Sequence, residues 1–130
     1  MKLQIDSPAP GSLMIRAYSP SGIQVNDALY KNSMLLLPAR IISDDLPADL
    51  VALEPRHINR ILELEPEILL LGTGPHQAWP DPALLAPLLR QSIGVECMTT
   101  AAACRSFNIL VAEDRRVAAL LLEVCTETGG

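Results

Sequence analysis

The sequence predicts a single α/β domain, in which a parallel-rich sheet carrying helices is joined to an N-terminal antiparallel β-layer. Two runs predict the sheet. Residues 68–71 are apolar at every position, as in a parallel strand covered on both faces, and Gly72-Thr73-Gly74 follow them. Residues 95–98 form a second short run that leads through Thr99 and Thr100 into a helical stretch. Short runs separated by turn residues in the first half predict the antiparallel layer.

The first half has the punctuation of antiparallel strands. Residues 13–18 and 23–25 flank Ser19-Pro20-Ser21-Gly22. Proline suits the second position of a type I turn, and glycine suits the left-handed position that closes a bulged hairpin. Two further apolar runs, at 34–37 and 40–43, precede a polar loop.

The hydrophobic period changes in the second half. Residues 58–65 have one apolar face, which predicts a short helix ended by Pro66. Asp81-Pro82 is a suitable N-cap and first-turn pair for a helix over residues 84–89. Pro87 lies deep in that helix, so we expect a kink there or a division into two shorter turns.

The chain ends in a further helix and strand. The inward face of the helix is predicted by apolar residues at i, i+4, i+7 and i+8: Ala103, Phe107, Leu110 and Val111. Residues 113–116 then turn the chain into a last strand at 117–124. The second half therefore has the order β-α-β-α-β, and residues 1–130 are predicted to form one domain.

Composition excludes several classes of function. A net charge of −5, a pI near 4.9 and the lack of a basic cluster argue against nucleic-acid binding. The first residues contain no apolar signal segment, and the longest apolar run, 117–122, is too short to insert in a membrane. Three cysteines without metal-type spacing suit a reducing compartment, so we expect a cytoplasmic protein without a metal or other cofactor.

A candidate ligand site follows from the topology. If both predicted strands are parallel, the turns that follow them meet at the sheet edge where open α/β sheets usually hold ligands. The amides of Gly72, Thr73 and Gly74 could form a nest for an anion, or the glycines could serve a tight turn. Gln77 stands where a nucleotide-binding fingerprint would have its third glycine, which argues against a nucleotide.

The helix after the second strand offers further groups. Thr99 and Thr100 could cap it, or its free amides could bind an anion. Arg105 and Asn108 are neighbours on one helix face. They could supply a charge and an amide to a ligand, or they could tie the helix to Glu96 or to a loop carbonyl.

Candidates for catalysis have plain structural alternatives. Glu96 could be a general base, or a paired or strand-end carboxylate. His76 and Cys97 could form a thiol–imidazole pair, or be a solvent-facing histidine and a packed cysteine. We expect Cys104 to be packed in the helix face. The sequence therefore assigns no catalytic residue, and the chain is expected not to be an enzyme.

Two segments together carry a family resemblance. Leu-Leu-Gly-Thr-Gly at 70–74 and the stretch from Val95 to Leu122 resemble a family of small α/β proteins of largely unknown function. That family includes the mitochondrial complex I assembly factor three and the adipogenesis-associated domain protein. The likeness extends to Gly22-Ile23 and to a pattern of Asn26, Tyr30 and Ser33, so it covers roughly residues 13–122.

The family pattern falls on particular positions of this chain. They are Gly72, Thr73, Gly74, Glu96, Met98, Thr99, Asn108, Glu113 and Arg116. Ser106 stands where threonine is expected, and the Asp44-Asp45 loop lacks a tryptophan often found there. The resemblance implies a compact layered fold and, in the mitochondrial members, a role in assembling a membrane complex. It implies no catalytic residues.

These observations give two functional hypotheses. The first is a non-enzymatic interaction or assembly-factor-like protein that binds a protein partner through the strand-end crevice and the Arg105 to Asn108 face. The second is a small-ligand or anion-binding protein, including an enzyme, that uses Gly72 to Gly74 with Thr99, Thr100 and Arg105.

Overall fold

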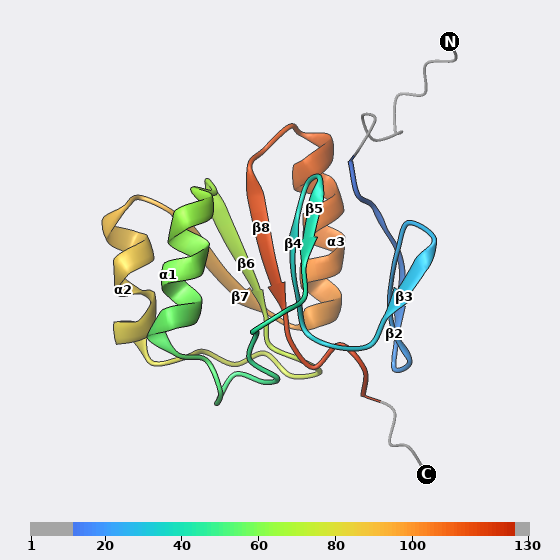
Figure 1. The fold of residues 1–130 in the computed structure, drawn as a ribbon, viewed down its shortest axis with the longest axis horizontal. Coiled ribbons are helices and arrows are strands. Elements are labelled where there is room, and N and C mark those ends of the chain that lie inside the picture. The colour runs from blue at the N-terminus through green and yellow to red at the C-terminus, as the bar shows by residue number, and fades with distance from the viewer. Residues whose placement is uncertain (1–11, 127–130) are drawn as a thin grey trace.

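The computed structural model describes residues 12–126 and confirms the predicted α/β fold (Figure 1). Its elements are β1 (Ile15–Ser19), β2 (Gly22–Val25), β3 (Ala28–Tyr30), β4 (Met34–Leu37), β5 (Arg40–Ile42), α1 (Pro55–Leu64), β6 (Ile68–Gly72), α2 (Pro82–Arg90), β7 (Gly94–Met98), α3 (Thr100–Ala112) and β8 (Val117–Leu121). Within this range, no helix is both long and apolar enough to cross a bilayer.

The strands form two sheets. β1, β2 and β3 make a three-stranded antiparallel sheet, which is the predicted N-terminal layer. The larger sheet has the order β5-β4-β8-β6-β7, and β6 pairs parallel with both β7 and β8. β4 pairs antiparallel with β5 and β8. The β4–β5 hairpin therefore belongs to the larger sheet, which contains the parallel strands, and not to the N-terminal layer.

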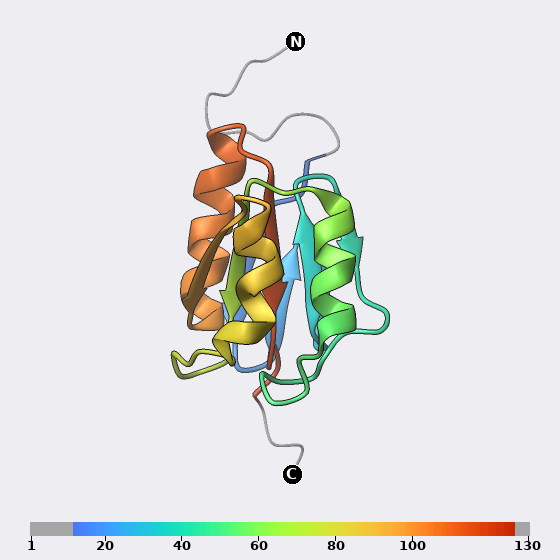
Figure 2. The same cartoon turned by 90° about the vertical axis from the view of Figure 1, so that its left-hand side faces the viewer.

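Both faces of the larger sheet are covered. α1 and α2 lie side by side over one face, while α3 and the three-stranded sheet cover the other (Figures 1 and 2). Side chains along β6 alternate between these layers, since Leu70 joins the core under α3 and Leu69 and Leu71 join the core under α1 and α2. Burial on both faces explains why this strand is apolar at every position.

The helix boundaries follow from local signals. α1 ends where Glu65 adopts a left-handed conformation directly before Pro66. Asp81 caps α2 by accepting a hydrogen bond from the Ala83 amide at 3.0 Å. The helix continues through Pro87 as one element, so it is not divided into two turns.

Two details of the strands differ from expectation. The irregularity in the first hairpin lies between Ile15 and Ala17 of β1, whereas Gly22 pairs directly with Ser19 across the turn. The last strand ends at Leu121, three residues before its predicted end. The chain turns there because Glu123 has a left-handed backbone with φ of 47°.

Candidate functional site

The glycine loop after β6 is held by the Thr73 side chain. Thr73 is only 4% exposed, and its amide donates to the Met98 carbonyl at 2.8 Å. Its hydroxyl donates to the carbonyl of His76 at 2.7 Å and accepts from the amide of Ala78 at 3.2 Å. These bonds close the loop on itself and fasten it to the end of β7.

Thr100 joins the same loop to the start of α3. Its hydroxyl accepts from the Gly74 amide at 2.8 Å and donates to the Leu122 carbonyl at 2.7 Å. Its amide donates to the Gly74 carbonyl at 2.9 Å. A Cβ atom on Gly72 would lie 3.0 Å from the Thr100 Cα, so the two segments approach closely. The two turns therefore lie side by side, as predicted for parallel strands.

The donors that an anion would need here have protein acceptors. The amides of Thr73, Gly74 and Thr100 are all bonded within the loop and helix junction. Thr99 caps α3 by accepting from the Ala102 amide at 3.2 Å. Its capping role is therefore confirmed, and an anion in this gap would have to displace existing hydrogen bonds.

The Arg105 to Asn108 face of α3 contacts the first hairpin. The Asn108 side chain donates to the Ile15 carbonyl at 2.8 Å and accepts from the Ile15 amide at 3.0 Å. Arg105 donates to the Tyr18 hydroxyl, and its guanidinium carbon lies 5.7 Å from the centre of that ring. Arg105 and Asn108 therefore tie α3 to another part of the protein, as in the structural alternative. Their partners lie in β1, and not at Glu96 or at a loop carbonyl.

The three side chains considered for catalysis have different surroundings. Glu96 is exposed on β7, the edge strand of the sheet. Burial raises the pKa of the Cys97 thiol, and residues 12–126 include no hydrogen bond between it and His76. Cys104 is buried as expected, and this burial raises its pKa to about 12. The described part of the chain also contains no group of three or more side chains suited to a metal ion.

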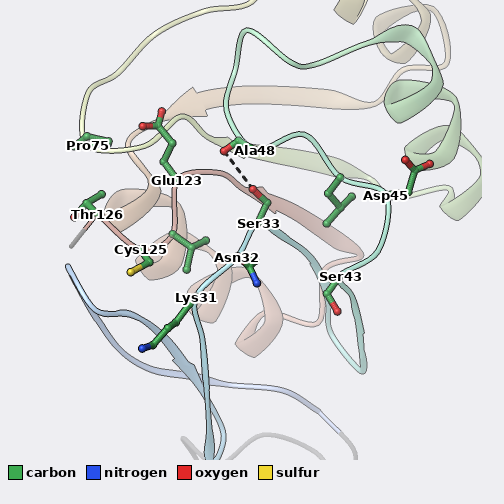
Figure 3. Close-up of a pocket in the computed structure, with 12 residues that line it drawn as sticks. Lys31, Asn32, Ser33, Ser43, Asp45, Ala48, Pro75, Glu123, Cys125 and Thr126 are labelled. Atoms are coloured by element: carbon green, nitrogen blue, oxygen red, sulfur yellow. Dashed lines mark hydrogen bonds between the residues drawn. The ribbon is translucent and has the colours of Figure 1, made fainter. Parts of the chain in front are cut away.

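A pocket of about 640 Å³ opens beside the glycine loop, at the carboxyl ends of the parallel strands β6 and β8 (Figure 3). It lies where β6 and β8 end and the antiparallel β4 begins. Its lining residues are Lys31, Asn32, Ser33, Ser43, Asp45, Leu46, Ala48, Pro75, Glu123, Val124, Cys125 and Thr126. None of the seven residues predicted to bind a ligand lines it, although Pro75 directly follows Gly74.

Sequence reasoning missed this pocket because separate segments meet to form it. Residues 31–33 precede β4, residues 43–48 follow β5, and residues 123–126 follow β8. Two lining residues had a signal in the sequence: Ser33 belongs to the family-like pattern of the first half, and Asp45 lies in the loop that departs from the family. The Ser33 hydroxyl donates to the Ala48 carbonyl at 3.4 Å, which bridges two of these segments.

Glu123 combines a left-handed backbone with a close approach to the glycine loop. Its left-handed backbone is uncommon outside glycine and asparagine. Its carboxylate packs over Gly74, where an added Cβ would lie 2.7 Å from Glu123 Oε2. Neither this carboxylate nor the Lys31 ammonium forms an ion pair within residues 12–126. Figure 3 shows the two side chains on different sides of the pocket, with Cys125 between them.

Comparisons with known proteins bear on these features. A family model described as "Protein of unknown function (DUF498/DUF598)" matches residues 15–122. The zebrafish NADH dehydrogenase [ubiquinone] 1 alpha subcomplex assembly factor 3 is 30% identical over 88% of this chain and 66% of its own length. A 13 kDa major membrane protein of Francisella tularensis is 25% identical over 85% of this chain and 90% of its own length. The chain thus spans slightly under two thirds of the zebrafish relative.

Solved structures show the same fold. An NMR structure from Xanthomonas campestris has a TM-score of 0.79 and 32% identity, covering 100% of this chain and 96% of that one. A crystal structure from Bordetella parapertussis has a TM-score of 0.80 and 34% identity, covering 88% and 98%. A crystal structure described as an outer membrane protein from Bartonella henselae has a TM-score of 0.74 and 35% identity, covering 87% and 96%.

Proposed function

The chain belongs to the family of unknown function DUF498/DUF598, and from this premise we propose that it is a non-enzymatic, assembly-factor-like protein that binds a protein partner. The observation that carries the proposal is its 30% identity, over most of its length, to an animal assembly factor of NADH dehydrogenase. Assembly factors act by binding other proteins. The buried Cys104 thiol gives no support to a catalytic alternative, and within residues 12–126 no hydrogen bond joins His76 to Cys97.

The contact surface we propose lies where α3 meets the first hairpin. Arg105 and Ile109 are four residues apart on α3 and therefore neighbours on its surface. Ile109 is 58% exposed, and the Tyr18 ring beside Arg105 is also exposed. Tyrosine and arginine are enriched at the residues that dominate protein–protein binding energy. Because Asn108 fixes α3 to β1, this Tyr18–Arg105–Ile109 surface is ordered before any partner binds.

The proposal can be tested by affinity purification of the wild type and of two variants from the producing cells, with the recovery of the bound protein compared among them. The wild type should retain a specific protein, and Ile109→Ser should reduce its recovery about tenfold or more, as expected for a residue at the centre of an interface. Leu89→Ser is the matched control, because Leu89 is also 58% exposed but lies on α2 over the opposite face of the sheet. Equal recovery with both variants, or no retained protein with the wild type, would contradict the proposed surface.

The cytoplasmic location is also part of the proposal. It is supported by the three cysteines, all of which are free in the described structure. Two similar bacterial proteins carry membrane locations in their names, so cell fractionation is the direct test. Recovery with the membrane fraction after a high-salt wash would contradict a cytoplasmic location.

A second candidate function is the binding of a small ligand or anion, including by an enzyme, near Gly72 to Gly74, Thr99, Thr100 and Arg105. The adjacent pocket supports a ligand in this region. If an anion binds there, sulfate should raise the melting temperature more than a non-binding salt at equal ionic strength, and Arg105→Ala should remove that increment. A wild type without such an increment would exclude the anion site.

A further inference from the structure

The pocket between β4 and β8 presents two opposite charges that the described protein does not neutralise. The Glu123 carboxylate lies toward Pro75, and the Lys31 ammonium lies on another side (Figure 3). Three charged residues line the pocket, and Asp45 is paired with Arg56. Glu123 and Lys31 are exposed and form no ion pair within residues 12–126, so both charges are accessible to a bound molecule.

The backbone around Glu123 is anchored on both sides. Leu122 donates its amide to the Gly72 carbonyl at 3.0 Å, and Thr126 donates to the Pro20 carbonyl at 2.8 Å, so the segment is anchored on both sides. Between these anchors Glu123 takes its left-handed conformation, and Gly74 leaves the space that the carboxylate fills. Asp45, which also lines the pocket, has a left-handed backbone as well, with φ of 54°. Backbone strain of this kind is enriched at functional sites.

The remaining lining defines the class of molecule. Asn32, Ser33 and Ser43 supply an amide and two hydroxyls, while Leu46 and Val124 add an apolar part. A volume of about 640 Å³ lies within the range of small-molecule sites, roughly 300–1,000 Å³. A simple anion would be repelled by Glu123, and a simple cation would be repelled by Lys31. A molecule with both charges satisfies both groups.

We propose that this pocket binds a small zwitterion of the α-amino acid or dipeptide class, with its ammonium at Glu123 and its carboxylate at Lys31. The apolar side chain of such a ligand packs near Leu46 and Val124. This site is independent of the proposed partner surface, because Tyr18, Arg105 and Ile109 do not line the pocket.

Glycyl-leucine and its blocked forms are suitable probes. Titration followed by NMR chemical shifts should show binding of the free dipeptide at residues around the pocket. N-acetyl-glycyl-leucine and glycyl-leucine amide each lack one charge and should bind about tenfold more weakly or worse, since hydrogen bonds to charged groups are the stronger ones. The doubly blocked form should bind most weakly of all.

Two variants assign the charges. Lys31→Met should weaken binding of the free dipeptide about tenfold and leave binding of glycyl-leucine amide, which lacks the carboxylate, unchanged. Glu123→Gln should also weaken binding of the free dipeptide about tenfold, but it should leave binding of N-acetyl-glycyl-leucine, which lacks the ammonium, unchanged. Arg40→Met and Glu63→Gln are matched controls, since both residues are exposed and neither lines the pocket. Melting curves without ligand verify that each variant is folded.

Several results would overturn the proposal. They are an absence of shifts with the free dipeptide, equal binding of the doubly blocked form, and unchanged affinity in both Lys31→Met and Glu123→Gln. Loss of partner retention in Ile109→Ser bears only on the proposed partner surface, so failure of one proposal is distinguishable from failure of the other.

Discussion

Two ionisable side chains lie buried in different parts of the molecule. Cys104 is 1% exposed on the buried side of α3, and His57 is 3% exposed at the start of α1. Burial disfavours the charged form of each group, so the pKa of the thiol is raised and the pKa of the imidazole is lowered. Both residues therefore stay neutral at physiological pH.

Cys104 should react slowly with a thiol reagent in the folded protein. Its pKa of about 12 leaves almost no thiolate at neutral pH, and the thiolate is the reactive species. A variant with Cys97→Ser and Cys125→Ser isolates this thiol. We expect slow labelling before denaturation and fast labelling after it. Fast labelling of the native variant at neutral pH would instead identify Cys104 as a candidate nucleophile.

His57 stabilises the start of α1 only in its neutral form. Nδ1 accepts a hydrogen bond from the Glu54 amide at 2.9 Å, and Nε2 is buried without a partner in the described structure. Protonation would remove this acceptor and add a buried charge. Asp45 and Glu54 would favour the charge, but burial and the neighbouring Arg56 and Arg60 outweigh them and lower the pKa.

Stability should consequently fall at mildly acidic pH. Because the folded state binds the His57 proton less readily, the unfolded chain takes up more protons below its ordinary pKa of about 6.5. The contribution of His57 to the free energy of unfolding should be constant above that pH. Below it, this contribution should fall by at most about 1.4 kcal/mol per pH unit. Urea titrations between pH 5 and 7.5 measure this slope.

His57→Gln should lose the slope, and His76→Gln, which changes an exposed imidazole, should keep it. The lowered carboxylate pKa values of Asp44, Asp45 and Glu67 act at still lower pH, so they do not confuse the comparison. An identical slope in the two variants would show that His57 is not the responsible group.

Among the elements, α3 has the largest organising role. It packs against β6 and β8, its first residues hold the glycine loop, and Asn108 holds β1. The three-stranded sheet is therefore attached to the rest of the molecule by hydrogen bonds between the Asn108 side chain and the β1 backbone, as well as by apolar contacts.

Asn108→Ala should destabilise this attachment. It leaves the Ile15 amide and carbonyl without their side-chain partners, which costs about 1–3 kcal/mol. Urea denaturation measures the loss, and amide exchange at Ile15 should accelerate. Asn59→Ala removes an exposed amide on α1 and serves as the control. A stability equal to that of the wild type would mean that apolar packing alone holds the sheet.

The sequence predicts those elements and contacts that depend on local signals. The parallel strands at 68–71 and 95–98 were predictable because apolar runs, caps and turns mark them, and the handedness of the crossover brings their ends together. The partners of the buried donors were not predictable. Thr100 accepts from Gly74, and Asn108 bonds Ile15 across 93 positions of sequence, and neither contact leaves a local pattern.

At the scale of the whole molecule, β6 separates the two cores. Leu70 is 1% exposed and faces the core under α3, while its neighbours face the other core. β6 also lies between β7 and β8 and pairs with both of them.

Leu70→Asp should abolish soluble folding. An unpaired buried charge costs several kcal/mol, compared with a total stability of about 5–15 kcal/mol. The variant should precipitate or lose its cooperative melting transition. Leu89→Asp, which places the same charge at an exposed leucine of α2, should remain folded. A soluble Leu70→Asp protein with an unchanged melting curve would show that this strand is not central.

The position of β8 has a consequence for how the chain acquires its structure during synthesis. This strand is the last element described along the sequence, and yet it lies in the middle of the larger sheet, between β4 and β6. A ribosome therefore exposes β4, β6 and the helices before their shared neighbour exists. Contacts so distant in sequence form slowly. Until residue 121 has emerged, the nascent chain presents two unpaired apolar strand edges, which are the kind of surface that chaperones protect.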